Sequence, residues 1–290
     1  MEITATQVKE LRDRTGAGMM ECKKALSECQ GNVDRAIEHL RKQGNLKAAK
    51  RSERTTSEGL IAEAVGKNQS EMALVELDCE TDFVARTDQF TKFVHELAQH
   101  VLQADPKSIE ELLQQKFKGQ PQATVQAVLT VLIQQTGENV TLKRFARLKT
   151  NGGQEVLASY VHPGNKIGVI VKIKTGQKGL SETAAREIAM HIAAMNPLYL
   201  SPADVPAEIA EQEKAIFQAN PDIQGKPENV AKNIVEGRYR KFLSEACLLQ
   251  QIFIKDSQGK NSVEKFLQSQ DPGATVLDFV RYQVGESDIH

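Results

Sequence analysis

The chain has 290 residues, a length that fits two domains of roughly 150 residues each. Hydrophobic residues make up 40% and charged residues 26%, an ordinary globular balance, and the formal net charge of -1 gives no support to bulk attraction to nucleic acid or a membrane surface. The chain has no tryptophan and few aromatic residues, which weakens any base-stacking role.

Cysteine usage and the start of the chain indicate a cytoplasmic protein. The four cysteines are scattered and form no CxxC pair, so neither a disulfide framework nor a zinc site is expected. The opening MEITATQVKE lacks the basic and apolar regions of a signal peptide. No apolar run reaches the length of about 18 residues that a membrane span needs.

Residues 1–46 predict a small domain of three short helices. Val8 and Leu11 recur at helical spacing, and similar pairs follow further along the chain. Thr6 and Asn32 are the expected N-caps, and glycines punctuate the helix ends. A core this small is expected to need support from its neighbours.

Residues 47–58 are polar and locally basic, and they predict a linker. The alternative is a patch that binds nucleic acid. No aromatic residue is interleaved there and the domain is not basic overall, so the linker interpretation is favoured.

An internal repeat follows and predicts the fold class. Each copy has an alternating strand, a hairpin turn, a second apolar strand, a polar junction and an amphipathic helix; the copies begin with GLIAEAV and EVLASYV. The repeat predicts an α+β core of two related β-hairpin/helix subdomains, residues 59–148 and 149–290.

The segments around the repeats predict further elements. Residues 204–246 predict an antiparallel helical hairpin inserted into the second subdomain, and its pattern fits an interaction device and a structural excursion equally well. The other predictions are helix at 106–135, strand at 137–150, strand at 248–255, helix at 262–270 and strand at 275–284.

Motifs of enzyme chemistry are missing from the sequence. There is no Walker A loop, GxSxG elbow or HExxH helix, and GAGMME fails as a dinucleotide fingerprint because Glu21 stands at its last position. Asp78, Glu80, Asp82 and Asp88 lie close together but lack the pattern of a calcium loop. We therefore expect no catalytic site, no cofactor and no metal.

Phe83, in the junction LDCETDFVART, fits two interpretations. Burial beneath the hairpin is the general expectation for phenylalanine, whereas an exposed aromatic beside an acidic residue would anchor a partner. The second copy has TGQKG at its junction and no aromatic, so the scaffold does not require one. Met19 and Met20 pose the same question, and we expect one or both to be exposed for binding.

The sequence resembles the bacterial translation elongation factor Ts family over nearly its whole length. The matching segments are VKELRDRTGAGMMECKKAL (8–26), GNVDRAIEHLRKQG (31–44), TDFVA (81–85), GENV (137–140), HIAAMNP (191–197) and VEGRYRKF (235–242). The resemblance implies a guanine nucleotide exchange factor for the GTPase elongation factor Tu, acting by protein contact without enzyme chemistry of its own.

The resemblance also implies roles for particular segments. The N-terminal domain would adopt a ubiquitin-associated (UBA-like) fold, and the hairpin at 204–246 would be a coiled-coil insertion through which a homodimer could form. Residues that would contact the GTPase are Arg12, Met19, Met20 and His162, together with Thr81, Asp82, Phe83 and Val84, the element that displaces its magnesium ion.

Two departures from the family pattern bear on that interface. Thr136 stands where members tend to carry isoleucine at a contact position, so this contact is expected to be weaker or replaced by Val140. The sequence stops at VGESDIH, where relatives often continue with a helix that adds contact, and a lower affinity is expected. Two other classes stay open: an adaptor that binds through the N-terminal domain without exchange, and an RNA-binding protein that uses the basic linker.

Overall fold

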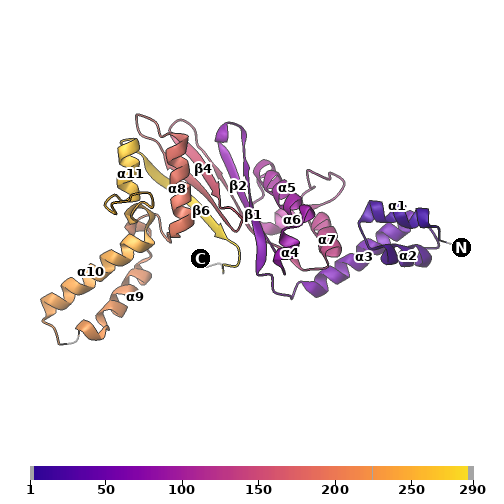
Figure 1. Cartoon of the computed structure of the whole chain (residues 1–290), viewed down its shortest axis with the longest axis horizontal. Coiled ribbons are helices and arrows are strands. Elements are labelled where there is room, and N and C mark those ends of the chain that lie inside the picture. The colour runs from indigo at the N-terminus through magenta and orange to yellow at the C-terminus, as the bar shows by residue number, and fades with distance from the viewer. Residues whose placement is uncertain (1–2, 224, 287–290) are drawn as a thin grey trace.

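The computed structural model describes residues 3–223 and 225–286. Three helices, α1 (Ala5–Thr15), α2 (Met19–Glu28) and α3 (Val33–Arg51), form a three-helix module at one end of an elongated molecule (Figure 1). The predicted helices are thus confirmed. Asn32 is an N-cap as predicted, but Thr6 is not: Thr4 caps α1, because its hydroxyl and the side chain of Gln7 form a reciprocal capping box.

Helix α3 corrects the predicted linker. It continues to Arg51, so residues 47–51 are helical and only residues 52–57 lie between the helix and the first strand. Lysine and alanine favour this continuation. The core also stabilises it, because Ala48 packs against the main hydrophobic cluster and the Arg51 guanidinium donates to the Ile133 carbonyl at 2.9 Å.

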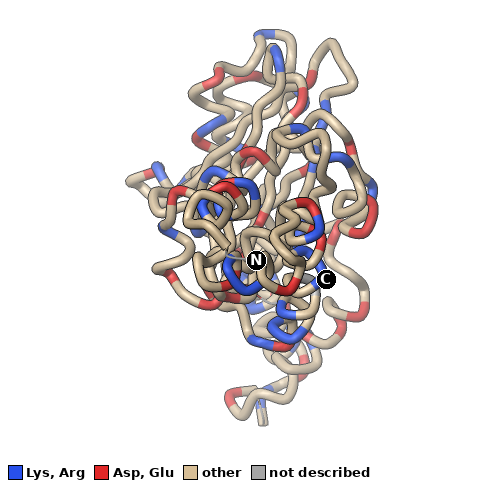
Figure 2. Tube along the Cα trace, turned by 90° about the vertical axis from the view of Figure 1, so that its right-hand side faces the viewer, with Lys and Arg blue, Asp and Glu red and all other residues tan. Residues whose placement is uncertain are grey.

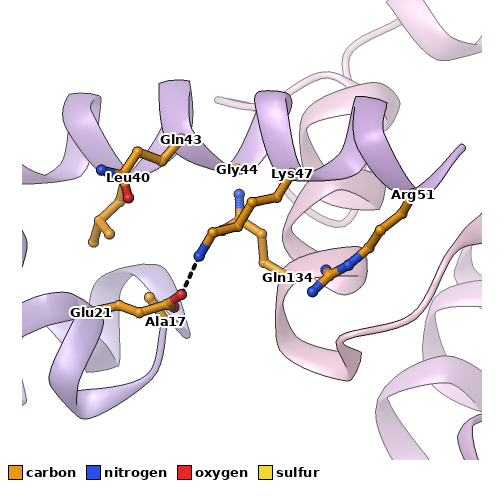
Figure 3. A pocket seen from close by; sticks show the side chains of 8 residues that line it. All are labelled: Ala17, Glu21, Leu40, Gln43, Gly44, Lys47, Arg51 and Gln134. Carbon is orange, nitrogen blue, oxygen red and sulfur yellow. Dashed lines mark hydrogen bonds and ion pairs between the residues drawn. The ribbon is translucent and has the colours of Figure 1, made fainter.

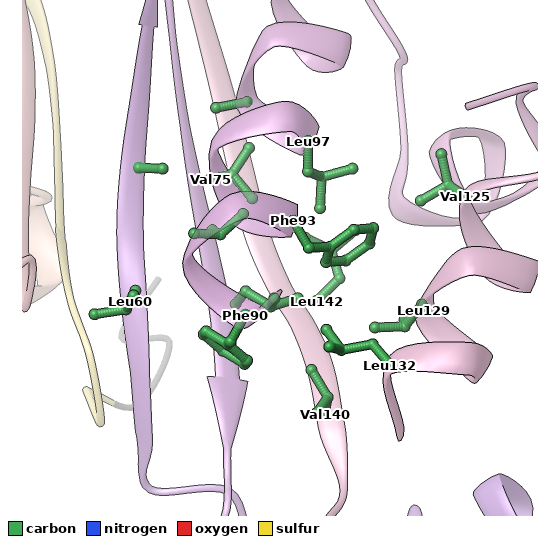
Figure 4. Close-up of a cluster of buried hydrophobic side chains, with 14 of the residues drawn as sticks. Leu60, Val75, Phe90, Phe93, Leu97, Val125, Leu129, Leu132, Val140 and Leu142 are labelled. Atoms are coloured by element: carbon green, nitrogen blue, oxygen red, sulfur yellow. The ribbon is translucent and has the colours of Figure 1, made fainter. Parts of the chain in front are cut away.

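The first unit, residues 58–149, is an antiparallel sheet with helices on one face. Its strands β1 (Glu58–Val65), β2 (Glu71–Cys79) and β3 (Val140–Lys149) pair in that order. Its helices are α4 (Asp82–Ala85), α5 (Asp88–Ala104), α6 (Ile109–Gln114) and α7 (Val125–Thr136), and a short 3-10 turn, Lys67–Gln69, joins β1 to β2. Figure 4 shows the core, where Phe90, Phe93 and Leu97 of α5 lie against the sheet.

The second unit, residues 155–283, repeats this plan. Strands β4 (Glu155–Val161), β5 (Ile167–Lys174) and β6 (Thr275–Gln283) pair in that order, and α8 (Glu182–Met195) and α11 (Val263–Gln270) pack on them. The inserted helices α9 (Ala207–Gln218) and α10 (Glu228–Ala246) project from the end of the molecule opposite the three-helix module (Figure 1). Short 3-10 turns flank them at Pro202–Asp204, Pro221–Ile223 and Leu248–Gln250.

The two sheets face each other through their inner surfaces. Ile61, Met72 and Leu74 of the first sheet form one buried cluster with Leu157 and Ile170 of the second. Since α5 covers the outer face of the first sheet and α8 that of the second, the centre of the molecule has four layers (Figure 1). The chain is therefore mixed α+β, as predicted. Within the described residues, no helix combines the length and apolarity that a membrane crossing needs.

The repeat is longer than the sequence analysis predicted. LLQQKF (112–117) and LLQQIF (248–253) occupy the same place in the two units, each between the helix that covers the sheet and the last helix of the unit, α7 or α11. His100 of α5 contacts Gln115 at 2.9 Å, and His191 of α8 contacts Gln251 at 3.0 Å, in both cases Nε2 to Oε1.

These segments correct two predictions. Residues 115–124 interrupt the helix predicted at 106–135, and residues 248–255 are a 3-10 turn and loop where a strand was predicted. Short apolar runs give little periodicity, so their pattern could not separate a strand from a buried connection.

Candidate functional site

Phe83 is the most exposed of the large apolar side chains in the described part of the chain, at 81%. It lies on α4, a single helical turn directly after β2, and the exposed interpretation is therefore confirmed. Val84 and Ala85, next to it, are buried in the main core. The turn is thus anchored by two small side chains while it presents one large one to solvent. Val84, predicted to contact a partner, is only 9% exposed and acts chiefly as this anchor.

Thr81 begins the turn and is held by Glu138, a residue that the sequence analysis missed. The Thr81 amide donates to Glu138 Oε2 at 3.0 Å, and its hydroxyl donates to Oε1 at 2.6 Å. The same hydroxyl oxygen accepts from the Val84 amide at 3.4 Å, which makes Thr81 the N-cap of α4. Glu138 lies in the GENV segment, 57 positions away along the chain, so no local pattern links the two.

A second carboxylate fastens the junction from the other side. Glu80 Oε1 accepts from the Asn139 amide at 2.6 Å and from the Arg54 guanidinium at 3.3 Å, and these hydrogen bonds lower the pKa of Glu80. Asn139 donates in turn to the Arg54 carbonyl at 2.8 Å. Burial raises the pKa of Cys79 to about 12, so Cys79 remains a thiol and donates to the Thr81 carbonyl.

Asp82 stands beside Phe83 and is only partly exposed. Its carboxylate pairs with Arg86 at 3.0 Å, one helical turn later. An exposed pair of this kind contributes little stability, about 0.5 kcal/mol. Asp82 therefore remains able to exchange this partner for one on another protein.

Val140 is not available for a contact, which corrects its predicted role. It begins β3 at 3% exposure, and its side chain points into the main core (Figure 4). The alternation of the strand turns Val140 toward the helices. Thr136, the last residue of α7, is half-buried, and its hydroxyl donates to the Leu132 carbonyl at 2.9 Å.

Met19 and Met20 are both exposed, at 59% and 76%. They form the first turn of α2 directly after its N-cap Gly18, so neither can reach the small core of the module. Arg12, also predicted for this surface, is exposed on α1. The prediction of methionine exposure is confirmed; a contact with a partner stays a prediction.

The C-terminal end of α7 joins the module to the junction. Gly44 of α3 lies against Gln134, and Gly16 lies against Gln135, in each case without room for a Cβ. Figure 3 shows the cavity at this contact, about 30 Å³, where Lys47 pairs with Glu21. That volume holds a single water and no larger ligand. Glu138 follows this end of α7, so the contacts run from the module to the exposed turn.

His162 is exposed in the turn between β4 and β5, as predicted for a contact residue. Its Nδ1 lies 3.0 Å from the Tyr160 hydroxyl, and its ring meets that of Tyr160 edge to face. The carbonyl of Asn165 in the same turn accepts from the Ile61 amide at 2.7 Å. Because the start of β1 pairs with the end of β2, His162 and Phe83 belong to the same end of the two sheets.

Charge on the molecule is mixed. Figure 2, seen from the end that holds the three-helix module, shows basic and acidic residues interspersed along the trace. The predicted basic linker shares this character, since Arg54 is paired with Glu80. Within residues 3–223 and 225–286, no cluster of three or more His, Cys, Asp or Glu side chains has an arrangement suited to a metal ion.

Comparisons with known proteins agree with one another. A family model described as elongation factor TS matches residues 80–286. A protein of Methylococcus capsulatus named elongation factor Ts is 46% identical over 99% of this chain and 93% of its own length. Proteins of the same name from Clostridium perfringens and Trichlorobacter lovleyi are 42% and 39% identical, over 98% and 99% of this chain and 93% and 94% of their own lengths.

Proposed function

The chain belongs to the elongation factor Ts family of translation elongation factors, and from that premise we propose that it is a guanine nucleotide exchange factor for elongation factor Tu. In this proposal it works in the cytoplasm during polypeptide elongation and performs no bond-making step. It accelerates the release of GDP by displacing the magnesium ion and disturbing the phosphate-binding site of its GTPase partner.

The physical basis of the proposal is thermodynamic coupling. The GTPase holds GDP through its magnesium ion and phosphate contacts, and a factor that binds best when these are disturbed must weaken the binding of GDP. By linkage, GDP weakens the binding of the factor by the same amount. Such a factor needs a rigid projection and a complementary surface, and it needs no general acid or base.

Phe83 carries the proposal. A phenylalanine at 81% exposure leaves apolar surface in water, and burying it in a partner would contribute about 1.5–3 kcal/mol. It projects from a turn that Glu138, Glu80 and two buried side chains fix in place. In the proposed complex Phe83 enters between helices of the GTPase domain, with Asp82 beside it and Thr81 and Val84 shaping the turn.

Other exposed residues extend the proposed surface. Arg12, Met19 and Met20 would dock the three-helix module on the GTPase domain, and His162 would add a contact from the second unit. We further propose that the α9–α10 hairpin can pair with a second copy of the chain, since Ile216 and Val230 are 61% and 40% exposed on it. Neither membrane nor nucleic acid is part of the proposal.

The test is the release of fluorescent GDP from purified elongation factor Tu, measured by stopped flow with and without this protein. We expect acceleration that saturates with protein concentration in millimolar magnesium. With EDTA present, the magnesium ion is already gone, so we expect the acceleration to shrink. Binding without any acceleration would contradict exchange and favour the adaptor.

A further inference from the structure

The direction of Phe83 cannot come from α4 itself. The helix has four residues, Asp82–Ala85, and a single turn fixes several dihedral angles for very few hydrogen bonds. An isolated turn would therefore be mostly unfolded, and Phe83 would sample many directions. What holds the turn must lie elsewhere in the fold.

Glu138 supplies that support. Its carboxylate accepts from both the amide and the hydroxyl of Thr81, at 3.0 and 2.6 Å. Because the hydroxyl proton is committed to Glu138, the hydroxyl oxygen faces the Val84 amide as an acceptor. The hydrogen bonds thus run from Val84 through Thr81 to Glu138. Hydrogen bonds to a charged acceptor are the stronger kind, and chains of them reinforce one another.

The second unit uses a similar brace without a projecting side chain. Asp271, directly after α11, accepts from the Gly176 amide at 2.7 Å and from the Lys178 amide at 3.1 Å. In both units a carboxylate between the last helix and the last strand therefore holds the backbone that follows the middle strand. Only in the first unit does the braced backbone start a helical turn that carries an exposed aromatic.

We infer that Glu138 is a positioning residue for exchange: it holds the Thr81 turn so that Phe83 points in one direction before the partner arrives. The inference rests on the proposed function for its effect on GDP release, but its structural part stands without it. Glu138 acts through Phe83 and needs no contact with the partner. Its place directly after α7, against which the three-helix module packs, also sets Phe83 relative to Met19 and Met20.

Glu138→Gln tests this with little change in shape. The amide replaces one of the two acceptor oxygens with an NH2 donor, so one of the two hydrogen bonds from Thr81 is lost in this geometry. We therefore expect the exchange of backbone hydrogens at residues 81–87 to accelerate. The matched control is Asp271→Asn, which should accelerate exchange at residues 176–181 and leave 81–87 unchanged. Mass spectrometry of peptic fragments measures both. Unchanged exchange at 81–87 in Glu138→Gln would overturn the inference, whatever the outcome with the GTPase.

GDP release provides the second readout. At saturating protein, Glu138→Gln should lower the maximal release rate about tenfold, in the range expected for a hydrogen bond to a charged group. The half-saturating concentration should change much less, since the rest of the surface is intact. Asp271→Asn should leave both unchanged at a temperature where each variant is shown to be folded.

A double variant decides whether Glu138 acts through Phe83. In a Phe83→Ala background, Glu138→Gln should have no further effect on the maximal rate, because no side chain is left to position. A full additional loss in that background would refute the positioning role. If the unaltered protein fails to accelerate release at all, the proposed function fails. Hydrogen exchange alone then tests whether Glu138 holds the Thr81 turn.

Discussion

The two units of the core share a frame and reverse its charges. The pairing of each middle strand with the last strand shifts register at the same place, opposite Glu76 and Leu77 in the first unit and opposite Lys172 and Ile173 in the second. At this place Glu76 pairs with Arg144 on β3 at 2.6 Å, whereas Lys172 pairs with Glu155 on β4 at 3.0 Å. Acid on one middle strand thus corresponds to base on the other, and each charge is paired within its own sheet.

The units differ most at the junction after the middle strand. In the second unit six residues, 175–180, separate the strand from the N-cap Ser181, whereas in the first unit seven residues, 80–86, precede the N-cap Thr87. The first junction folds into the α4 turn with Phe83, whereas residues 175–180 form no helical turn. Of the two equivalent junctions in the repeated units, only the first carries the proposed contact residue, Phe83. The second unit folds without an aromatic at this position.

The buried carboxyl group of Asp78 predicts an unusual pH dependence for the first unit. Asp78 faces the second sheet at 4% exposure, and its Oδ1 has no hydrogen-bond partner among the described residues. Burial, aided by Glu76, raises the pKa of Asp78 from its ordinary 3.8 to about 7, although Lys143, Arg144 and Lys166 oppose the shift. The folded state therefore binds this proton more tightly than the unfolded state.

Asp78→Asn should remove this pH dependence, and the resulting change in stability is the largest that we expect. The contribution of Asp78 to the free energy of unfolding is fully present below about pH 4 and is lost as pH rises to 7. Above pH 7 the free energy of unfolding of the variant should therefore rise, relative to that of the unaltered protein, by up to about 4 kcal/mol. Urea unfolding at several pH values measures the difference. An exposed Asp13→Asn variant is the control. A difference that does not vary with pH would contradict the assignment.

The histidine pair offers a test of equivalence between the units. His100→Ala and His191→Ala each remove a buried ring that contacts a phenylalanine, Phe117 or Phe253, and remove the histidine partner of a glutamine Oε1. Burial lowers the pKa of His191, so it packs as a neutral ring. Both variants should lose about 3 kcal/mol of unfolding free energy.

Calorimetry of the two histidine variants checks this equivalence. Exposed His95, on the same helix as His100, provides a control whose replacement by alanine should cost little. A large loss of unfolding free energy in only one of the two buried-histidine variants would show that the repeated LLQQ segments contribute differently to stability in the two units.

The sequence predicted the frame well and the bracing poorly, for physical reasons. Strand alternation and helical spacing are local, so the hairpins, α8 and α11 followed from the pattern. Phe83 and the two methionines could be singled out because their types are unusual at such junctions. Glu138 could not, because its contact with Thr81 joins residues far apart in the chain, and a single glutamate in a loop has no distinctive pattern.

Phe83→Ala makes the first junction resemble the second in lacking an aromatic. We expect stimulated GDP release to fall by up to about a hundredfold, the upper part of the range for burying a phenylalanine. Its melting temperature should stay nearly unchanged, because the side chain is 81% exposed. Phe90→Ala, in the core, is the contrasting control and should lose about 3–5 kcal/mol of stability. A Phe83→Ala variant that melts several degrees lower would show that the side chain supports the fold.

Met19→Ala combined with Met20→Ala tests whether the three-helix module contributes binding without contributing to release itself. The two side chains are exposed and far along the chain from the junction, so their loss should weaken affinity for elongation factor Tu about tenfold and leave the maximal release rate nearly intact. Titration calorimetry and stopped flow separate the two quantities, and Leu46→Ala, exposed on α3, is the control. If the maximal rate fell as far as in Phe83→Ala, the three-helix module would contribute to GDP release as well as to binding. The difference between the two junctions would then not be enough to explain which residues accelerate release.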